Sequence, residues 1–360
     1  MSGRHVLLGH LDRIAEWTKG QHHYMVLYHE ANKDICRDLG PNVQWQECPA
    51  YTAGWAGRAA WETVKLPGIA AKTRADFMFT PAGTVVPGLS LPQVSFAQNP
   101  WSLVSDLDRS PAQQLKAVIQ RRNYRSAMKN AAMMVFNSEY MRQAYRQNAG
   151  FEEKASEVVY QALDEETHAA AEIARQSTEK KDFQVLCVSA MAAHKGAETL
   201  VEALALVRGE HGIPATLVMA GPWPDAVYEK KIRALIEQYD LSGIVEIRGH
   251  VSREELHNLY AESRVFSLMS HCESFGIPAI EAQAFGTPVV SSNCCAIPEV
   301  CGAGGLFPQP GDAQGVARDL AALLSDRASW TQHSEAALEN AAKYHWDLCS
   351  KKLLRMFQAI

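Results

Sequence analysis

The chain has 360 residues, enough for two domains of ordinary size, and 47% of them are hydrophobic and 21% charged, as in a globular protein. A formal net charge of −5 argues against a dedicated nucleic-acid-binding protein. No apolar run approaches the roughly 18 residues of a membrane-spanning helix, and the first residues are not typical of a signal peptide. Eight cysteines without zinc-site spacing predict reduced thiols and a cytoplasmic protein without a metal.

The first half of the chain predicts alternating helices and strands. Apolar residues at helical spacing predict a first helix over residues 5–17, although residues 5–8 would also fit a short strand. Strands are expected at 24–28, 43–45, 77–80, 93–96 and 133–136. A long helix is expected at 112–131, with Ser110 as its N-cap and Pro111 in its first turn.

The second half has a clearer pattern. Short apolar runs predict strands at 184–188, 215–220, 244–248, 265–269, 288–291 and 305–307. Amphipathic patterns between and after them predict helices at 198–208, 228–239, 254–263, 278–285 and over most of 337–360. Strands that alternate with helices of this length form parallel sheets covered by helices on both faces. Because residues 162–181 are polar and charged, we predict two Rossmann-like α/β domains, 1–163 and 164–345.

The segment from Glu273 to Glu281 follows a predicted strand and opens a predicted helix, with Pro278 suited to its first position. Backbone N–H groups at 274–277 would converge there and bind an anion such as phosphate. Carboxylates on either side would suit sugar hydroxyls flanking a diphosphate. Acidic residues at a helix start also stabilise helices that bind nothing, which leaves a purely structural role open.

Two further strand ends carry candidate ligand-binding groups. Lys195 follows the strand at 184–188, where the crevice of an open α/β sheet binds ligands, and its cation could neutralise a diphosphate. An ordinary surface lysine is the alternative. His250 and Val251 follow the strand at 244–248, where the backbone could meet a base.

Together these motifs resemble the donor-binding half of glycosyltransferase family 4, which has the two-lobed GT-B fold. The resemblance covers residues 182–326 and includes Lys195-Gly196, Gly249-His250-Val251, the run Glu273-Ser-Phe-Gly-Ile-Pro with Glu281, and Glu299. It implies two Rossmann-like domains facing a cleft, with a nucleotide sugar held by the second.

The resemblance implies a role for each matching residue. Lys195 and Glu273 would be the catalytic pair, with Lys195 on the diphosphate and Glu273 on the donor sugar, while Glu281 would bind the ribose. The complete set of expected donor-binding residues is Gly221, His250, Val251, Ser274, Phe275, Gly276, Ile277 and Glu281.

The expected activity is a retaining, metal-independent transfer from a nucleoside-diphosphate sugar, with UDP favoured over GDP. The acceptor would be a saccharide or a lipid-linked saccharide of a cell-surface glycan. The sequence departs from the family at Ala190, where an arginine is usual. A degenerate nucleotide-sugar-binding protein, or an epimerase or phosphorylase on the same fold, therefore remains an alternative.

The acceptor side is less clear. The family often has a histidine at a strand end of the first lobe, where this chain has Gln98 and Asn99, which can form hydrogen bonds but cannot exchange protons usefully. Residues 116–146 are rich in lysine and arginine, which predicts contact with an anionic membrane or a phosphorylated acceptor, and hence a peripheral position at the inner face of the membrane. A solvated face of an ordinary helix is the alternative.

The start of the chain departs from the family pattern as well. The segment around Gly3 resembles the glycine-containing loop that follows the family's first strand, so that strand is expected to be missing and the first sheet to have an opening. This predicts a natural start further upstream or a truncated form. A helix at 346–360 is expected to cross back to the first domain, as in the family, and a plain C-terminal helix on the second domain is the alternative.

Overall fold

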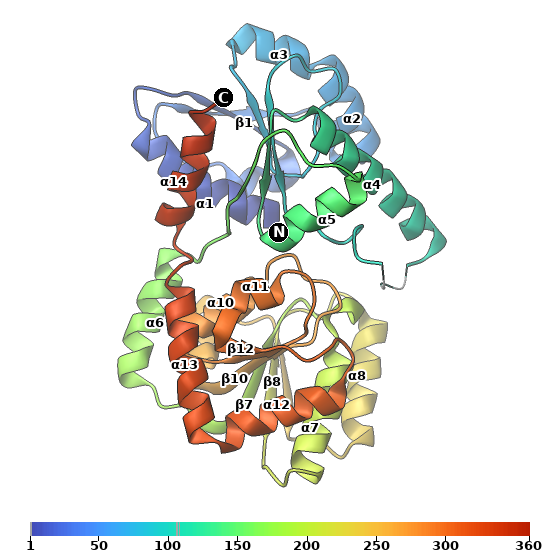
Figure 1. The fold of residues 1–360 in the computed structure, drawn as a ribbon, viewed down its shortest axis with the longest axis vertical. Helices are drawn as coiled ribbons and strands as arrows, with labels where there is room; N and C mark the ends of the chain where they lie inside the picture. Colours follow the sequence, from blue (N-terminus) through green and yellow to red (C-terminus); the bar gives the residue numbers. More distant parts are fainter. Residues whose placement is uncertain (1, 106, 108) are drawn as a thin grey trace. The chain divides into compact units, whose positions relative to one another are not determined.

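The computed structural model describes residues 2–105, 107 and 109–360. The chain forms two compact units (Figure 1). The first contains residues 2–103, 111–162 and 346–360, and the second contains Leu163–His345 with the described residues of the loop 104–110. The chain therefore leaves the first unit after Ala162 and re-enters it at Trp346.

The first unit contains short parallel strands connected by helices. Its elements are α1 (Ser2–Trp17), β1 (Tyr24–Tyr28), η1 (Glu30–Ile35), β2 (Val43–Glu47), η2 (Ala50–Ala53), α2 (Trp55–Val64), α3 (Leu66–Thr73), β3 (Met78–Thr80), β4 (Gln93–Ala97), α4 (Pro111–Asn130), β5 (Met133–Phe136), α5 (Glu139–Ala149), β6 (Ser156–Val158) and α14 (Trp346–Phe357). Here η denotes a 3₁₀ helix. Every strand predicted for this half is present, with ends shifted by at most two residues.

The strands of the first unit form two separate parallel sheets in the described part of the chain. One pairs β1 with β2, and the other has the order β3-β4-β5-β6. The opening expected in the first sheet is therefore confirmed. Strand β4, inside the larger sheet, is buried over its whole length.

Helix α1 confirms the helix predicted over 5–17 and corrects the prediction of a loop around Gly3. Gly3 lies in the first turn of α1 and not in a loop, and residues 5–8 are helical and do not form a strand. The reason is that α1 buries two sides. Val6 and Ile14 pack in a cluster with strand β4, whereas Leu11 and Ala15 pack against Val26 of β1. Residues three or four positions apart, such as Leu11, Ile14 and Ala15, lie on neighbouring parts of a helix surface, so α1 packs in both clusters at once.

The C-terminal helix α14 packs beside α1, as the red and blue ribbons of Figure 1 show. Trp346, at its first position, is only 2% exposed and belongs to the same core cluster as Val6. A Cβ atom at Gly9 would lie 2.3 Å from the Trp346 ring, so glycine permits this close approach. The helical prediction over 337–360 is thus divided between two units, because the chain crosses over before Trp346.

The second unit is a regular α/β domain. Its elements are α6 (Glu165–Ser177), β7 (Lys181–Val188), η3 (Ala193–Lys195), α7 (Ala197–Gly209), β8 (Thr216–Ala220), α8 (Ala226–Gln238), β9 (Val245–Gly249), α9 (Arg253–Glu262), β10 (Ser263–Leu268), α10 (Ile277–Ala284), β11 (Val289–Ser291), α11 (Ile297–Cys301), η4 (Gly302–Gly304), β12 (Gly305–Leu306), α12 (Ala313–Ser325) and α13 (Arg327–Ala341). All the strands predicted for this half are present.

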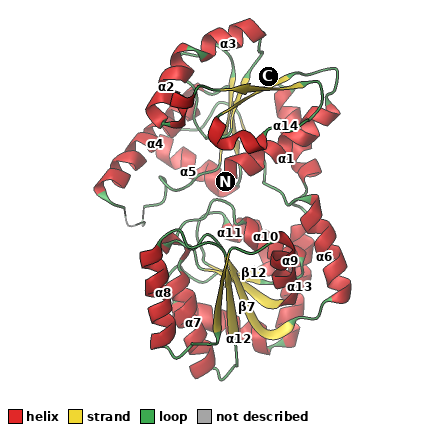
Figure 2. Cartoon of the chain, turned by 180° about the vertical axis from the view of Figure 1, so that it is seen from behind, coloured by secondary structure: helices red, strands yellow, loops and turns green. Residues whose placement is uncertain are grey.

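The six strands of the second unit form one parallel sheet in the order β12-β11-β10-β7-β8-β9. Helices α7, α8 and α12 lie on one face, and α6, α9 and α10 on the other (Figure 2). The chain adds strands outward from β7 to β9 and then returns to place β10 on the other side of β7. The loops after β7 and β10 therefore diverge at a topological switch point, where open α/β sheets bind ligands.

Candidate functional site

The loops after β7 and β10 are tied together at the carboxyl edge of the second sheet. The backbone N–H of His271 donates to the carbonyl of His194 over 2.8 Å. Gly196 has a φ of 63°, and a Cβ atom there would lie 2.0 Å from the carbonyl oxygen of Met269. Glycine is thus required both by the left-handed backbone and by the close approach of the two loops.

Lys195 and Glu273, the two predicted catalytic residues, form an ion pair between these loops. The Lys195 Nζ lies 2.7 Å from Glu273 Oε2, and the side chains are only 16% and 12% exposed. The other carboxylate oxygen of Glu273 accepts a hydrogen bond from the backbone N–H of Ser274 over 2.9 Å. A fixed cation and a fixed carboxylate thus lie together at the switch point.

The start of α10 presents backbone donors next to this pair. Gly276 is the N-cap residue with a φ of 91°, and a Cβ atom there would lie 2.5 Å from Ile297 Cδ1. The Phe275 side chain is buried and meets the Tyr344 ring edge-on, so it packs in the core of the second unit and does not face a ligand. Pro278 is the second helical residue and not the first, because α10 begins at Ile277.

Glu281 lies in the second turn of α10 and accepts a hydrogen bond from the hydroxyl of Tyr260 over 2.8 Å. Burial raises the pKa of Glu281 to about 7, although the Tyr260 hydroxyl and Arg253 act in the opposite direction. Tyr260 comes from α9 and is itself fully buried. The carboxyl group is therefore oriented by a buried phenol, a contact that the sequence motif did not reveal.

The remaining predicted donor-binding residues follow β8 and β9 at the same sheet edge. Gly221 has a φ of 130°, and a Cβ atom there would lie 1.8 Å from the carbonyl oxygen of Ser189. Its N–H donates to the carbonyl of Gly249 over 2.5 Å. After Gly249 the side chain of His250 is exposed and that of Val251 is partly exposed. The structure thus brings every predicted donor-binding residue to one edge of one sheet.

Two groups beside the ion pair were not among the predicted site residues. His194 is exposed, and desolvation by the surrounding loops together with the Lys195 ammonium lowers its pKa. Its position next to Lys195 in a strand-end loop was the available signal. The second group consists of three cysteines, Cys272, Cys294 and Cys295, whose thiols contact one another. Their sequence separation gave no indication of this contact.

On the acceptor side, Gly3 and Gln98 are neighbours within the first unit. A Cβ atom at Gly3 would lie 3.4 Å from Gln98 Nε2. The Gln98 amide is buried, donates to the carbonyl of Pro81 and accepts from Gln161. Asn99 is exposed, and its side chain accepts the backbone N–H of Trp101. Both amide side chains therefore already have partners within the fold.

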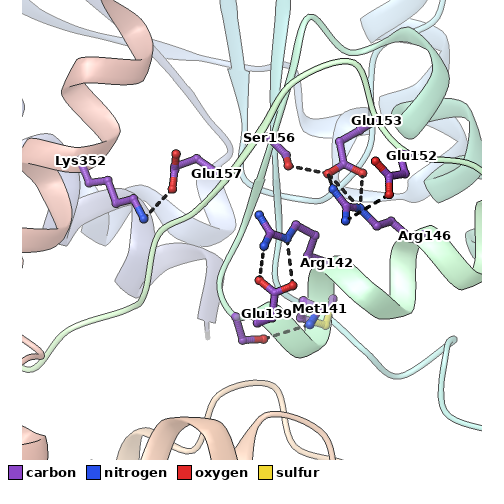
Figure 3. A network of polar contacts seen from close by, with 10 residues as sticks. Glu139, Met141, Arg142, Arg146, Glu152, Glu153, Ser156, Glu157 and Lys352 are labelled. Atoms are coloured by element: carbon purple, nitrogen blue, oxygen red, sulfur yellow. Dashed lines mark hydrogen bonds and ion pairs between the residues drawn. The ribbon is translucent and has the colours of Figure 1, made fainter.

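The basic segment 116–146 separates into two different surfaces. On α5, Arg142 pairs with Glu139, and Arg146 pairs with Glu152 and Glu153 (Figure 3). Burial raises the pKa of Glu153, but the hydrogen bonds from Arg146 and Ser156 bring it below its usual value. The α5 arginines are thus neutralised locally.

On α4, Arg122, Arg125 and Lys129 are exposed and form no ion pair that the structure records. Beside them, three apolar side chains are also exposed, namely Leu115 at 63%, Val118 at 52% and Ile119 at 51%. Within residues 2–105, 107 and 109–360, no cluster of three potential metal ligands is present, and no helix is long and apolar enough to cross a bilayer.

Comparison with known sequences places residues 170–344 within the model for "Glycosyl transferases group 1". The O-antigen chain mannosyltransferase B of Escherichia coli is 30% identical over 178 residues, which are 49% of this chain and 45% of that protein. The D-inositol 3-phosphate glycosyltransferase of Corynebacterium urealyticum is 32% identical over 171 residues, 46% of this chain and 40% of that one. The similarity thus spans less than half the length of these relatives.

Comparison with solved structures covers both units and confirms the GT-B fold. HepE of Anabaena, solved in complex with UDP and glucose, has a TM-score of 0.73 at 18% identity, and the match covers 100% of this chain and 96% of the HepE chain. WaaG, a glycosyltransferase involved in lipopolysaccharide biosynthesis, has a TM-score of 0.64 at 19% identity, and the match covers 96% of this chain and 94% of the WaaG chain. At such low identity these likenesses establish the fold alone.

Proposed function

We propose that the protein is a retaining glycosyltransferase that uses a nucleoside-diphosphate sugar, because residues 170–344 match the model for glycosyl transferases group 1. The observation that carries the proposal is the Lys195–Glu273 pair beside the start of α10. This arrangement combines a cation, a carboxylate and the N-terminus of a helix at one topological switch point.

Each group has a distinct role in the proposed reaction. Lysine has three N–H donors, so Lys195 can keep its bond to Glu273 and still donate two to the diphosphate. The N–H groups at 274–277 bind the same phosphates, and the Ser274 N–H exchanges its bond to Glu273 for one to a phosphate oxygen. Glu281 accepts the ribose hydroxyls and Glu273 those of the sugar. As the bond to the sugar breaks, the cation and the backbone dipoles stabilise the negative charge that develops on the diphosphate, without a metal ion.

Retention of configuration requires the acceptor to attack the face from which the diphosphate leaves. In the proposed step, a phosphate oxygen of the leaving group takes the proton from the acceptor hydroxyl while the new bond forms. This assignment needs no proton-transferring side chain from the first unit, where Gln98 and Asn99 occupy the expected position.

We propose UDP as the nucleotide of the donor, which the UDP-bound HepE structures support by analogy. A thermal-shift panel of UDP-glucose, GDP-mannose and ADP-glucose tests this choice, because a ligand that binds only the folded state raises the unfolding temperature. The UDP sugar is expected to give the largest shift. A larger shift with GDP-mannose would refute UDP, and no shift with any donor would contradict the proposed function.

Ala190 favours a second candidate, a nucleotide-sugar-binding protein without transferase activity. It is exposed after β7, where the family usually provides an arginine. Product analysis separates the two candidates. A new glycosidic product with the donor's anomeric configuration supports the transferase, whereas nucleotide binding without any product supports the binding protein. A product formed without acceptor indicates an epimerase, and one that requires inorganic phosphate indicates a phosphorylase.

For the acceptor we propose a saccharide or lipid-linked saccharide of a cell-surface glycan, by analogy with the O-antigen mannosyltransferase and with WaaG, which is involved in lipopolysaccharide biosynthesis. The exposed face of α4 supports a lipid-linked acceptor, because it combines three apolar side chains with basic neighbours. On this proposal α4 lies against an anionic membrane surface, whereas the ion-paired arginines of α5 take no part.

Flotation with vesicles tests the membrane contact. Vesicles rich in phosphatidylserine should retain the protein, whereas phosphatidylcholine vesicles should not. Ile119→Glu is expected to abolish flotation by placing a charge on the apolar stripe. Val64→Glu is the matched control, since Val64 is an exposed apolar residue (69%) on α2 of the same unit. Equal flotation of the two variants would refute the assignment to α4.

A further inference from the structure

Three cysteines gather where two loops of the donor site meet. Cys272 follows β10, and Cys294 and Cys295 follow β11, the parallel neighbour of β10. The thiol of Cys295 is hydrogen-bonded with those of both Cys272 and Cys294. Cys272 is buried, and the other two are partly exposed. A central thiol thus has one thiol neighbour from each of two loops, and solvent reaches part of the cluster.

The two loops are held closely in this arrangement. Cys295 has a φ of 49°, a left-handed conformation that is uncommon for a residue with a side chain. Ile297, two residues later, packs so closely on Gly276 that a Cβ atom there would lie 2.5 Å from its Cδ1. Cys272 is the immediate neighbour of Glu273. Any covalent change at the thiols therefore acts directly on the loop that carries Glu273 and leads into α10.

We propose that Cys272 and Cys295 form a modification site for small-molecule disulfides, which convert the two thiols into an intramolecular disulfide that lowers donor affinity. The effect on affinity rests on the proposed function, whereas the disulfide itself does not.

The pair Cys272–Cys295 is favoured over Cys294–Cys295 by geometry. Adjacent Cα atoms are about 3.8 Å apart, which is below the roughly 4.4–6.8 Å that ordinary disulfides span. Residues on neighbouring loops do not have this restriction.

The reaction balances with a disulfide as the oxidant. A thiolate of the cluster attacks one sulfur of the oxidant, forms a mixed disulfide and releases one small thiol. The second cysteine then attacks the protein sulfur of that mixed disulfide and releases the second small thiol. Two electrons pass from the protein to the oxidant, and the two protons leave with the released thiols.

The thiol contacts also set the conditions for this reaction. The hydrogen bond with Cys295, together with burial, raises the pKa of the Cys272 thiol, and the corresponding contact and burial raise that of Cys294. Cys272 and Cys294 are therefore less ionised at neutral pH than ordinary thiols, and exchange that begins at Cys272 should accelerate as the pH rises.

The experiment treats the protein with glutathione disulfide at pH 7 and pH 8.5. We expect the loss of two free thiols without retained glutathione, faster at pH 8.5, and a cross-linked peptide pair containing Cys272 and Cys295. We also expect the Kd for UDP to rise by about tenfold, roughly the loss of one hydrogen bond to a charged group, and to return after treatment with dithiothreitol.

Two variants serve as controls, each compared with its own reduced form. Cys272→Ser should lose the cross-link, whereas Cys349→Ser should retain it, since Cys349 is equally buried but lies in α14 of the other unit. Absence of the Cys272–Cys295 cross-link at pH 8.5, or an unchanged UDP Kd in the cross-linked protein, would overturn the proposal. Failure of the reduced protein to bind UDP would instead count against the proposed function, because the mapped cross-link is read independently of any donor.

Discussion

Replacing Glu281 with glutamine tests the electrostatics of the donor site without removing its shape. The pKa of Glu281 is raised from 4.5 to about 7, mainly by burial. A carboxyl group with a raised pKa in the folded state stabilises the fold at low pH and loses that contribution as the pH rises through the folded value. Glu281→Gln removes this titration, and its amide oxygen can still accept the hydroxyl of Tyr260.

The size of the effect follows from the shift in pKa. A difference of about 2.5 units corresponds to about 3 kcal/mol between the two protonation states. Between pH 5 and pH 8, linkage then predicts that the wild type loses about 2.5 kcal/mol of unfolding free energy through this group alone. The stability of Glu281→Gln relative to the wild type should therefore rise by up to that amount over the same range.

Urea unfolding at pH 5 and pH 8 measures this difference for the second unit. Glu254→Gln is the matched control, because Glu254 is an exposed glutamate on α9 that forms no hydrogen bond or ion pair recorded in the structure. It should show no pH-dependent gain. If Glu281→Gln gained less than about 0.5 kcal/mol relative to the wild type between the two pH values, the inferred burial of this charge would be refuted.

Three further variants test other contacts of the site. Lys195→Gln should lower the transfer rate at least about 100-fold, since it removes the cation that stabilises the charge developing on the diphosphate. A variant with the wild-type rate would refute the proposed contact between Lys195 and the diphosphate. Gly221→Ala should lower the free energy of unfolding, measured with urea, by at least about 2 kcal/mol. The added Cβ atom would lie 1.8 Å from the carbonyl oxygen of Ser189, and the backbone there has a positive φ. An unchanged urea midpoint would contradict this close approach. In Tyr260→Phe, the loss of stability caused by ionisation of Glu281 should occur at higher pH, because the Tyr260 hydroxyl lowers the pKa of Glu281. An unchanged dependence of stability on pH would show that this hydrogen bond does not lower the pKa of Glu281.

Predictions from sequence were most successful where a local pattern determines a local element. In the second unit, apolar runs and amphipathic segments located every strand, most clearly the inner strands β8 and β10, which are buried on both faces. In the first unit, α2, α3, α5 and β6 were not predicted. Helix α5 shows the reason, since it buries only Met141, Tyr145 and Ala149 among polar residues, and its clearest signal was the N-cap Ser138.

The start of the chain shows the limit of local patterns. The helix over 5–17 was predicted from spacing alone, but its extension back through Gly3 depends on packing against two sheets at once. The opening in the first sheet could be expected from the family pattern. Which strands remain on each side of it is a property of the tertiary structure.

By itself, the sequence determined that Lys195, Glu273 and Glu281 lie at strand and helix ends of one α/β domain, because residue type and periodicity are local properties of the chain. Only the tertiary structure decided which of these groups touch. The order β10-β7 within the sheet brings Lys195 to Glu273, and the packing of α9 brings Tyr260 to Glu281. The neighbouring positions of β10 and β11 bring Cys272 to Cys295. These contacts join residues 21 to 78 positions apart, and they form because strand order and helix packing, which no local pattern encodes, bring distant segments together.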